Sequence, residues 1–373
     1  MAIEVWGLDD GYGDVKGTNG KENIYFPSNV TTYKEKFSDA LSESEKKEPK
    51  SRMIVEYDNK KFLVGTAAQK QDMQSSWIGG NNKHKHPMFP ALAKTALNML
   101  GQEDVTKVDP LVLGLPVEHE EKVERRELLT KLLKKKHDVK LTMADGETYE
   151  KTIDVKDVVI VKQPFGSFCD VILDETGEVK DPDLALKFVS VVDIGAGTVN
   201  YLTLQELESI SELTKHTNKG MYSAYQEIAR RIEVEFDKKY PLGRLPEFIK
   251  SGFITGGHNI SHIVDEVFEL HAGEIMNEWE TINRNSMDFI EVVIFTGGGS
   301  EVLKEHLERA VEEYAFETKF LGVHNTANGL RKYGVRQSKQ KGNVVTRTAG
   351  GSVKISAPEK KKEEVAVNGA TKK

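Results

Sequence analysis

The chain contains a single cysteine, Cys169, in 373 residues. One thiol cannot form an intramolecular disulfide, and a scarcity of cysteine suits a reducing compartment. The sequence also lacks any run of about 18 apolar residues, the length that a membrane-spanning helix needs. Its first residues follow a strand pattern at once, without the basic and apolar regions of a signal peptide. We therefore expect a soluble, cytoplasmic protein with no membrane partner.

Neither sign of charge is in large excess. The chain has 52 Lys and Arg against 59 Asp and Glu, a formal net charge of −7, and acids and bases are interspersed through most of its length. A dedicated nucleic-acid surface would need a concentration of positive charge, so we expect no direct nucleic-acid binding. The length is sufficient for two domains of ordinary size, each with its own core.

What the sequence does have is a glycine pattern that interrupts an apolar stretch. Residues 188–204 resemble one strand that breaks at Asp193-Ile-Gly195-Ala-Gly197-Thr198 and resumes as a second strand, which predicts a β-hairpin with glycines at its tip. Glycines allow positive φ there, so that successive N–H groups can point into one concavity that cradles a phosphate. The alternative interpretation of a single such motif is a tight turn without a ligand.

An Asp-x-Gly-x-Gly pattern also follows a strand pattern near the N-terminus, at Asp9, Gly11 and Gly13. Two like hairpins suggest two like half-molecules that grip one nucleotide across a cleft. An aspartate at a strand end would repel a phosphate directly, so its expected role is to hold a hydrated Mg²⁺, which takes few carboxylates. Lys16 would then supply countercharge to a polyphosphate; otherwise it is a solvated surface lysine.

A third glycine junction follows the apolar stretch 290–296. Here Gly297, Gly298 and Gly299 precede a helix pattern from Glu301 to Tyr314. Such a junction lets a flat ligand lie against bare backbone. Close packing of the helix on the strand would require the same small residues and is the alternative explanation.

Two charged segments have simpler interpretations. Glu118 to Lys136 predicts one amphipathic helix whose basic end, Lys131 and Lys134–Lys136, suits the negative end of the helix dipole. Beyond Gln337 the composition shifts to Lys, Gly, Ser, Thr and Glu, which cannot bury enough apolar area to order a chain. We expect residues 338–373 to form a disordered charged tail.

The three glycine junctions occur in a fixed order, with a strand and Gln163-Pro164 between the first and the second. This arrangement resembles the actin-like ATPase superfamily, and within it the bacterial plasmid-segregation actins of the ParM/StbA type. The resemblance covers most of residues 1–336. It implies an α/β fold of the actin-like, ribonuclease H-like duplicated kind, a two-domain ATPase with an interdomain nucleotide cleft. Domain I would comprise residues 1–162, completed by 320–337, and domain II residues 163–319.

The resemblance also implies roles for individual residues. It makes Gln163, Asp193 and Asp9 catalytic and the two aspartates the ligands of Mg²⁺. The residues implied to contact ATP, or GTP in its place, are Asp9, Gly11, Tyr12, Gly13, Lys16, Gly195, Ala196, Gly197, Thr198, Asn200, Lys219, Glu227, Gly297, Gly298 and Gly299. Actin has a second acid where this chain has Ala196, so metal coordination would rest more heavily on the two aspartates. Ala327 and Gly329 resemble the second connecting segment, where Gly329 would allow close contact with the other half.

Proteins of this kind bind Mg-ATP, polymerise with their own copies into filaments and hydrolyse ATP to make the filaments unstable. A DNA-bound adaptor protein then couples the filament to plasmid copies, so the resemblance implies a role in plasmid segregation. An amide cannot take up a proton, so Gln163 suits orienting a water toward a γ-phosphate and not deprotonating an alcohol.

Two alternatives stay open from the sequence. A sugar- or acetate-type kinase on the same fold would need a carboxylate base, for which an acid elsewhere, such as Asp170, would have to serve. A nucleotide-gated scaffold would bind without hydrolysis. A chaperone of the heat-shock ATPase kind would need a folded peptide-binding domain after the ATPase, and the polar tail cannot be one.

Overall fold

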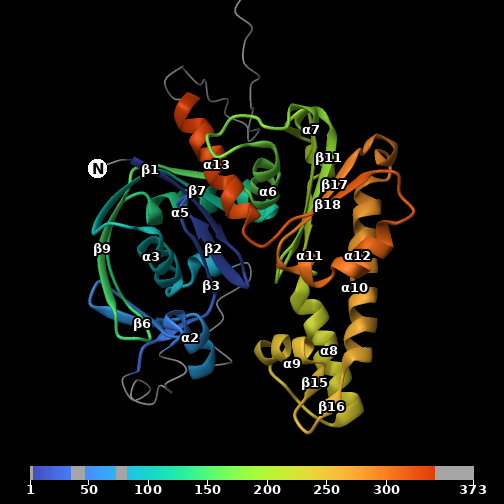
Figure 1. Cartoon of the computed structure of the whole chain (residues 1–373), viewed down its shortest axis with the longest axis horizontal. Helices are drawn as coiled ribbons and strands as arrows, with labels where there is room; N and C mark the ends of the chain where they lie inside the picture. The colour runs from blue at the N-terminus through green and yellow to red at the C-terminus, as the bar shows by residue number, and fades with distance from the viewer. Residues whose placement is uncertain (1–2, 35–46, 73–81, 341–373) are drawn as a thin grey trace, which may run out of the picture.

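The computed structural model describes residues 3–34, 47–72 and 82–340, which form two α/β bodies side by side (Figure 1). The sheet of the first body has the strand order β3-β2-β1-β7-β9-β8-β5-β6-β4, and β10 also pairs with β7. Its strands are β1 (Ile3–Asp10), β2 (Asp14–Thr18), β3 (Asn23–Pro27), β4 (Val30–Thr32), β5 (Met53–Tyr57), β6 (Lys60–Val64), β7 (Val105–Leu115), β8 (Lys136–Thr142), β9 (Thr148–Val155) and β10 (Val158–Lys162).

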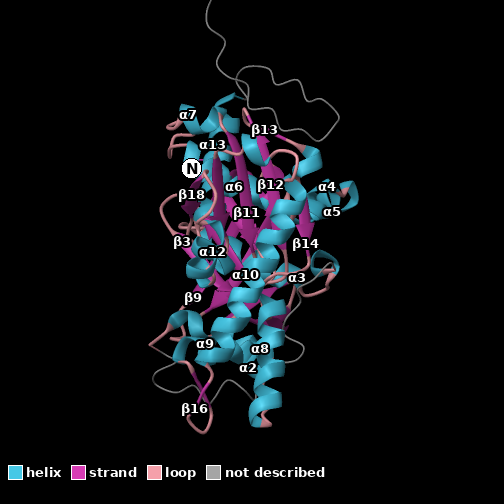
Figure 2. Cartoon of the chain, turned by 90° about the vertical axis from the view of Figure 1, so that its right-hand side faces the viewer, coloured by secondary structure: helices cyan, strands magenta, loops and turns pink. Residues whose placement is uncertain are grey.

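The sheet of the second body has the order β13-β12-β11-β17-β18, with β14 paired to β12. Its strands are β11 (Phe188–Ile194), β12 (Val199–Gln205), β13 (Glu208–Ser209), β14 (Lys215–Thr217), β17 (Val292–Thr296) and β18 (Glu317–Phe320), and a separate small hairpin joins β15 (Phe253–Ile254) and β16 (His258–Asn259). Figure 2 shows the strands of the second sheet behind α10, with α8, α9 and the small hairpin at one end of the molecule.

The two sheets share one pairing pattern. In the first, β1 is antiparallel to β2 and parallel to β7, and β7 is parallel to β10. In the second, β11 is antiparallel to β12 and parallel to β17, and β17 is parallel to β18. This repeat confirms the duplicated α/β fold that the two like hairpins predict.

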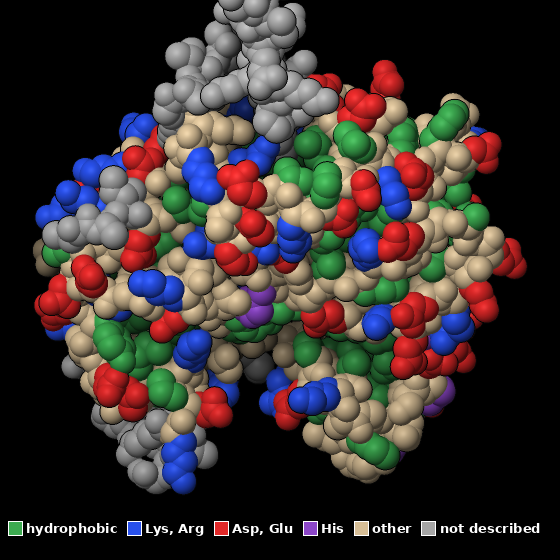
Figure 3. All heavy atoms as spheres, turned by 45° about the horizontal axis from the view of Figure 1, so that its top comes forward, with side chains coloured by type: hydrophobic (Ala, Val, Ile, Leu, Met, Phe, Trp, Pro, Cys, Tyr) green, Lys and Arg blue, Asp and Glu red, His purple; other side chains and the backbone are tan. Residues whose placement is uncertain are grey.

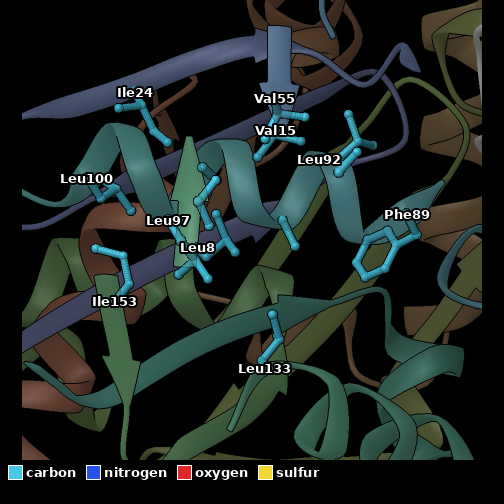
Figure 4. Packing of buried hydrophobic residues seen from close by; sticks show 14 of the residues in the cluster. Leu8, Val15, Ile24, Val55, Phe89, Leu92, Leu97, Leu100, Leu133 and Ile153 are labelled. Atoms are coloured by element: carbon cyan, nitrogen blue, oxygen red, sulfur yellow. The ribbon is translucent and has the colours of Figure 1, made fainter. Parts of the chain in front are cut away.

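The helices cover the sheets and join the bodies. They are α2 (Thr66–Gln71), α3 (Phe89–Leu100), α4 (Val117–Glu121), α5 (Val123–Leu133), α6 (Gln163–Ile172), α7 (Pro182–Leu186), α8 (Met221–Phe236), α9 (Leu245–Ser251), α10 (Ser261–Asn283), α11 (Gly298–Val302), α12 (Lys304–Val311) and α13 (Asn325–Gln340). Helix α3 repeats its apolar residues at helical spacing, so one face carries Phe89, Leu92 and Leu100 into the core of the first body (Figure 4). Each such side chain contributes about 1.5–3 kcal/mol when fully buried.

Two helices are exchanged between the bodies. Helix α6 begins directly after β10 of the first sheet, yet it packs on β11 and β12 of the second. Helix α13 follows β18 of the second sheet and packs on β1 and β7 of the first. A shared apolar cluster contains Val112 and Val161 from the first sheet, Val191 from the second and Leu330 from α13. The two bodies therefore share one core at the end where these helices lie.

The structure differs from two local expectations. The helix predicted from Glu118 to Lys136 is broken, because Lys122 has an extended backbone (φ −80°, ψ 106°) between α4 and α5. Lys136, the last residue of the predicted helix, is instead the first residue of β8, where it pairs with Asp154 of β9. Helix α13 runs to Gln340 and so includes the first residues of the predicted tail; residues 341–373 lie outside the described part of the chain. The predicted domain boundaries stay a prediction.

The surface agrees with the charge pattern of the sequence. On the face shown in Figure 3, acidic and basic side chains lie interspersed over both bodies, and a notch separates the bodies along one edge. Within residues 3–34, 47–72 and 82–340, none of the helices combines the length and apolar character that crossing a bilayer requires.

Candidate functional site

The first glycine hairpin forms as the sequence predicts. Strand β1 ends at Asp10, strand β2 begins at Asp14, and the antiparallel register places Asp9 opposite Lys16. Both side chains are buried, and Nζ of Lys16 lies 3.5 Å from Oδ2 of Asp9. The countercharge expected of Lys16 therefore already has a partner within the hairpin, and the solvated-surface interpretation of Lys16 is excluded.

The second hairpin has the same register. Asp193 on β11 lies opposite Asn200 on β12, and the N–H of Gly195 donates to the carbonyl of Thr198 at 2.9 Å to close the tip. Helix α8 begins against this tip, where the N–H of Tyr222 donates to the carbonyl of Ala196 at 2.8 Å. Local backbone hydrogen bonds thus hold the tip, and its two glycines are partly exposed.

The two hairpin tips contact each other. A Cβ added to Gly13 would lie 2.7 Å from Cβ of Ala196, and one added to Gly197 would lie 2.5 Å from Cδ2 of Tyr12. The Tyr12 hydroxyl in turn bonds to the imidazole of His119 at 3.2 Å. These glycines are therefore required, at least in part, by the direct approach of one tip to the other.

The third glycine junction follows β17, which lies parallel to β11. Gly297 has a φ of 86°, and a Cβ there would lie 2.6 Å from Oδ1 of Asp193; a Cβ on Gly299 would overlap Ile194. Close packing thus explains these two glycines. Gly298 differs, because the nearest atom to a Cβ there is Cγ1 of Val323 at 3.9 Å. Of the three glycines, Gly298 is therefore the one whose place close packing does not require.

Carboxylates outnumber cations between the tips. Burial raises the pKa of Asp193 to about 7, and the negative charge of Asp9 adds to the rise while Lys16 opposes it. Burial also raises the pKa of Asp14, again against Lys16. Burial alone would lower the pKa of Lys16, but these three carboxylates raise it above its ordinary value. Lys16 therefore interacts with all three acids, and Lys83 acts on Asp14 as well, so that carboxylates outnumber lysines at the site.

This donor set suits a hard divalent cation. The described part of the chain has no group of three or more His, Cys, Asp or Glu side chains arranged to hold a metal. A site with one or two carboxylates fits Mg²⁺, which retains several water ligands. Asp9 and Asp193 are candidates for these carboxylates, because both are buried and the negative charge of Asp9 raises the pKa of Asp193.

Gln163 reaches the same place from the connection between the bodies. It is the first residue of α6, it is buried, and its Nε2 donates a hydrogen bond of 2.6 Å to Oδ1 of Asp9. Pro164 at the second helical position suits a helix start because the missing N–H has no intrahelical partner there. The structure thus brings together Asp9, Lys16 and Gln163, with Asp193 within electrostatic reach.

Three of the remaining candidates have other partners. Lys219 is exposed, and its Nζ lies 3.2 Å from Glu274 on α10. Glu227 accepts from Arg230 and Arg231 on its own helix, and the hydrogen bond from Arg230 is the main cause that lowers its pKa to about 2. Asn200 is buried, and its Oδ1 accepts from the N–H of Val117 at 3.1 Å. Asn200 thereby ties the second hairpin to α4.

A second buried cluster, which no sequence pattern predicts, lies behind the first tip. Lys83 forms an ion pair of 2.5 Å with Oδ1 of Asp10, and Nε2 of His84 lies 2.9 Å from Oδ2 of the same carboxylate. Lys83 and His84 belong to the run Lys-His-Lys-His, whose polar composition is typical of a surface turn. Only the three-dimensional contact with Asp10, 73 residues earlier, shows that they support the site.

Comparison with known proteins gives matches over both bodies. Residues 7–166 match the family model of the N-terminal domain of actin-like proteins, and residues 191–309 match the C-terminal model of the MreB-like archaeal actin homologues. A comparison with curated protein sequences found no match.

Solved structures share the fold of the whole described chain. Apo pSK41 ParM is 21% identical, with 91% of this chain and 99% of that chain covered and a TM-score of 0.66. A ParM in a 15-stranded filament from Clostridium botulinum is 20% identical, with coverages of 90% and 99% and a TM-score of 0.72. An archaeal actin homologue in complex with ADP is 18% identical, with coverages of 91% and 100% and a TM-score of 0.67.

Proposed function

The chain belongs to the actin-like proteins, and from this premise we propose that it binds Mg-ATP, or Mg-GTP in its place, between its two bodies and assembles into filaments that nucleotide hydrolysis makes unstable. We further propose that these filaments segregate plasmid DNA through a DNA-bound adaptor protein. The similarity to a ParM filament and to an ADP-bound actin homologue supports assembly and nucleotide binding.

One observation carries the proposal. Gln163, at the start of the helix that joins the bodies, donates to the same aspartate that Lys16 approaches from the neighbouring strand, and Asp193 lies within electrostatic reach. A cation for the phosphates, two acids for a metal and an amide for a water are the groups that phosphoryl transfer to water requires. Their convergence is more specific than the fold alone, because one fold can host many activities.

Each residue has a distinct task in this proposal. Backbone N–H groups of the two tips would hold the phosphate chain, as glycine-rich turns do, and Lys16 would neutralise part of its charge. Asp9 and Asp193 would hold Mg²⁺, which would supply positive charge to offset the negative charge of the phosphates. Gln163 would orient a water toward the γ-phosphate; its amide has no basic atom, so it acts by position.

The kinase alternative is less well supported. The acid considered as its base, Asp170, lies on α6 with its Oδ1 2.7 Å from Nζ of Lys332, and its Oδ2 accepts from the amide of Asn325. Both carboxylate oxygens of Asp170 thus already face partners on α13, so neither is directed at a substrate hydroxyl in the cleft between the hairpin tips.

The test is assembly with each nucleotide. Light scattering of the protein at tens of micromolar should rise on addition of Mg-ATP or Mg-GTP and decay as phosphate is released, and electron microscopy should show filaments at the maximum. Protein that stays unassembled with both nucleotides, yet consumes ATP only when a small hydroxyl or carboxylate acceptor is added, would favour the kinase.

A further inference from the structure

A fully buried lysine lies behind the first hairpin tip. Lys83 precedes α3 in a short 3-10 turn (Lys83–Lys85), and its side chain has no exposed surface. Besides the ion pair with Asp10, its Nζ donates to the carbonyl of Gly11 at 2.6 Å, to the carbonyl of Asp10 at 3.4 Å and to Oγ of Ser28 at 3.3 Å. All of these acceptors belong to the tip or to the residue that braces it.

The two adjacent aspartates at the end of β1 serve opposite sides of the strand. Successive side chains of a strand point to opposite faces. Asp9 is bonded to Gln163 and Lys16, whereas Asp10 is bonded to Lys83 and His84. Lys83 therefore holds the strand end from the face opposite to the proposed nucleotide site.

The carbonyls of the tip are fixed on that same side. Ser28 donates from Oγ to the carbonyl of Gly11 at 2.8 Å and from its N–H to the carbonyl of Gly13 at 2.7 Å. In a trans peptide the C=O and the following N–H point in opposite directions. Lys83 and Ser28 hold the carbonyls of Gly11 and Gly13. The N–H groups that follow these carbonyls, those of Tyr12 and Asp14, consequently point away from Lys83 and Ser28.

Stability alone is a weak reason to bury such a pair. Desolvating two charges costs several kcal/mol per ion, and well-packed apolar residues of similar volume often serve the fold equally well or better. What apolar residues cannot do is donate several directed hydrogen bonds to one loop. The geometry is therefore that of a brace on the loop.

We propose that Lys83 is a positioning residue that presets the first tip for the phosphate chain of a nucleoside triphosphate. This inference rests on the proposed nucleotide binding. Because Lys83 does not face the bound phosphates, it acts through the backbone of Gly11 and through Asp10. Without it the tip would sample conformations whose N–H groups do not converge, and each binding event would have to order the loop.

The experiment compares three variants with the wild-type protein. K83M removes the ammonium and leaves the buried charge of Asp10 with His84 as its remaining side-chain partner, which by itself destabilises the fold. D10N/K83M removes both charges and isolates the loss of the brace. K85M changes the exposed lysine of the same turn and is the matched control. The measurements are melting temperature without nucleotide, hydrogen exchange of residues 11–14 without nucleotide, and Kd for Mg-ATP.

We expect D10N/K83M to melt within a few degrees of wild type, to exchange the amides of residues 11–14 at least tenfold faster, and to bind Mg-ATP at least tenfold more weakly. K85M should match wild type within twofold. A folded D10N/K83M with wild-type loop exchange and wild-type Kd would overturn the inference, as would unfolding of both Lys83 variants. Failure of the wild type to bind nucleotide would instead overturn the proposed function, and the exchange measurement would still decide whether Lys83 holds the tip.

Discussion

Gly329 on α13 crosses Gly166 on α6 so closely that a Cβ added to Gly329 would overlap the carbonyl oxygen of Gly166 and lie 2.5 Å from the backbone nitrogen of Asp170. The overlap is with backbone, which cannot rotate out of the way. The two exchanged helices therefore approach each other at a distance that only glycine permits.

The first prediction concerns this crossing. Gly329→Ala should destabilise the protein by at least about 3 kcal/mol, because the helices must separate and open the shared core. Gly273→Ala is the matched control, since Gly273 lies within α10 and a Cβ there meets nothing within 4 Å. Replacing an unhindered helical glycine stabilises by about 0.5–1 kcal/mol. Chemical denaturation should thus give changes of opposite sign; equal effects would contradict the crossing.

The second prediction concerns the excess of acid between the tips. Asp193→Asn should raise the stability of the nucleotide-free protein by roughly 1–2 kcal/mol at pH 8, because it removes one of two buried carboxylates that repel each other. The same change should abolish the Mg²⁺-dependent stabilisation by ATP, which for wild type is about 2.7 kcal/mol at a hundredfold excess over Kd.

Asp183→Asn is the control, because it makes the same replacement of aspartate by asparagine at an exposed site on α7. Thermal melts with and without Mg-ATP give both quantities. A D193N protein that retains the full Mg²⁺-dependent shift would show that Asp193 is not a metal ligand.

The parts of the site that the sequence could predict are those set by neighbouring residues. Both hairpins follow from an Asp-x-Gly-x-Gly pattern between apolar strands, and a register fixed by the tip then places Lys16 opposite Asp9. The contact of Gly329 with the other half was also predictable, because a lone glycine inside a helix costs stability unless something approaches it.

Other parts depend on contacts between distant segments. Lys83 is recognisable only once α3 has packed and placed it behind the tip, since a lysine in a polar run predicts exposure. The family resemblance implied that Glu227 contacts the nucleotide, yet its carboxylate pairs with two arginines one turn away on α8. The break at Lys122 likewise could not be predicted from the charge pattern, because the residues on either side of it are typical of a helix.

The third prediction concerns pH. Burial lowers the pKa of His137 to about 4, and the positive charge of the nearby Lys94 contributes to this lowering. The hydrogen bond between Nε2 of His137 and the Leu133 carbonyl acts in the opposite direction and raises the pKa. In the unfolded chain the pKa is near 6.5. At a pH between these two pKa values, His137 binds a proton in the unfolded state but not in the folded state. The free energy of unfolding therefore falls as the pH falls from about 6.5 to about 4.

The share of His137 in this loss should be about 2–3 kcal/mol at pH 4. His137→Gln keeps a donor for the Leu133 carbonyl and does not titrate, so its stability should fall less steeply over this range. His258→Gln, at an exposed position on β16, is the control. Denaturant unfolding at several pH values measures the slopes; parallel curves for H137Q and wild type would contradict a buried neutral His137.

The fourth prediction separates assembly from hydrolysis. Gln163→Ala leaves the two tips and the third glycine junction intact, so the nucleotide-bound arrangement of the bodies can still form. It removes the amide that the proposal assigns to the attacking water, and such positioning is worth several kcal/mol of barrier. Filaments formed with ATP should persist, while phosphate release falls by an order of magnitude or more.

The bond from Gln163 to Asp9 adds a second consequence. If the amide serves only to orient Asp9, Q163A should weaken Mg²⁺ binding, and raising the Mg²⁺ concentration should restore phosphate release. If it orients the water, release should stay low at saturating Mg²⁺ although nucleotide binding is complete. Light scattering and phosphate release, each measured across a Mg²⁺ titration, distinguish the two roles, and a variant that disassembles and releases phosphate at the wild-type rates would remove Gln163 from the mechanism.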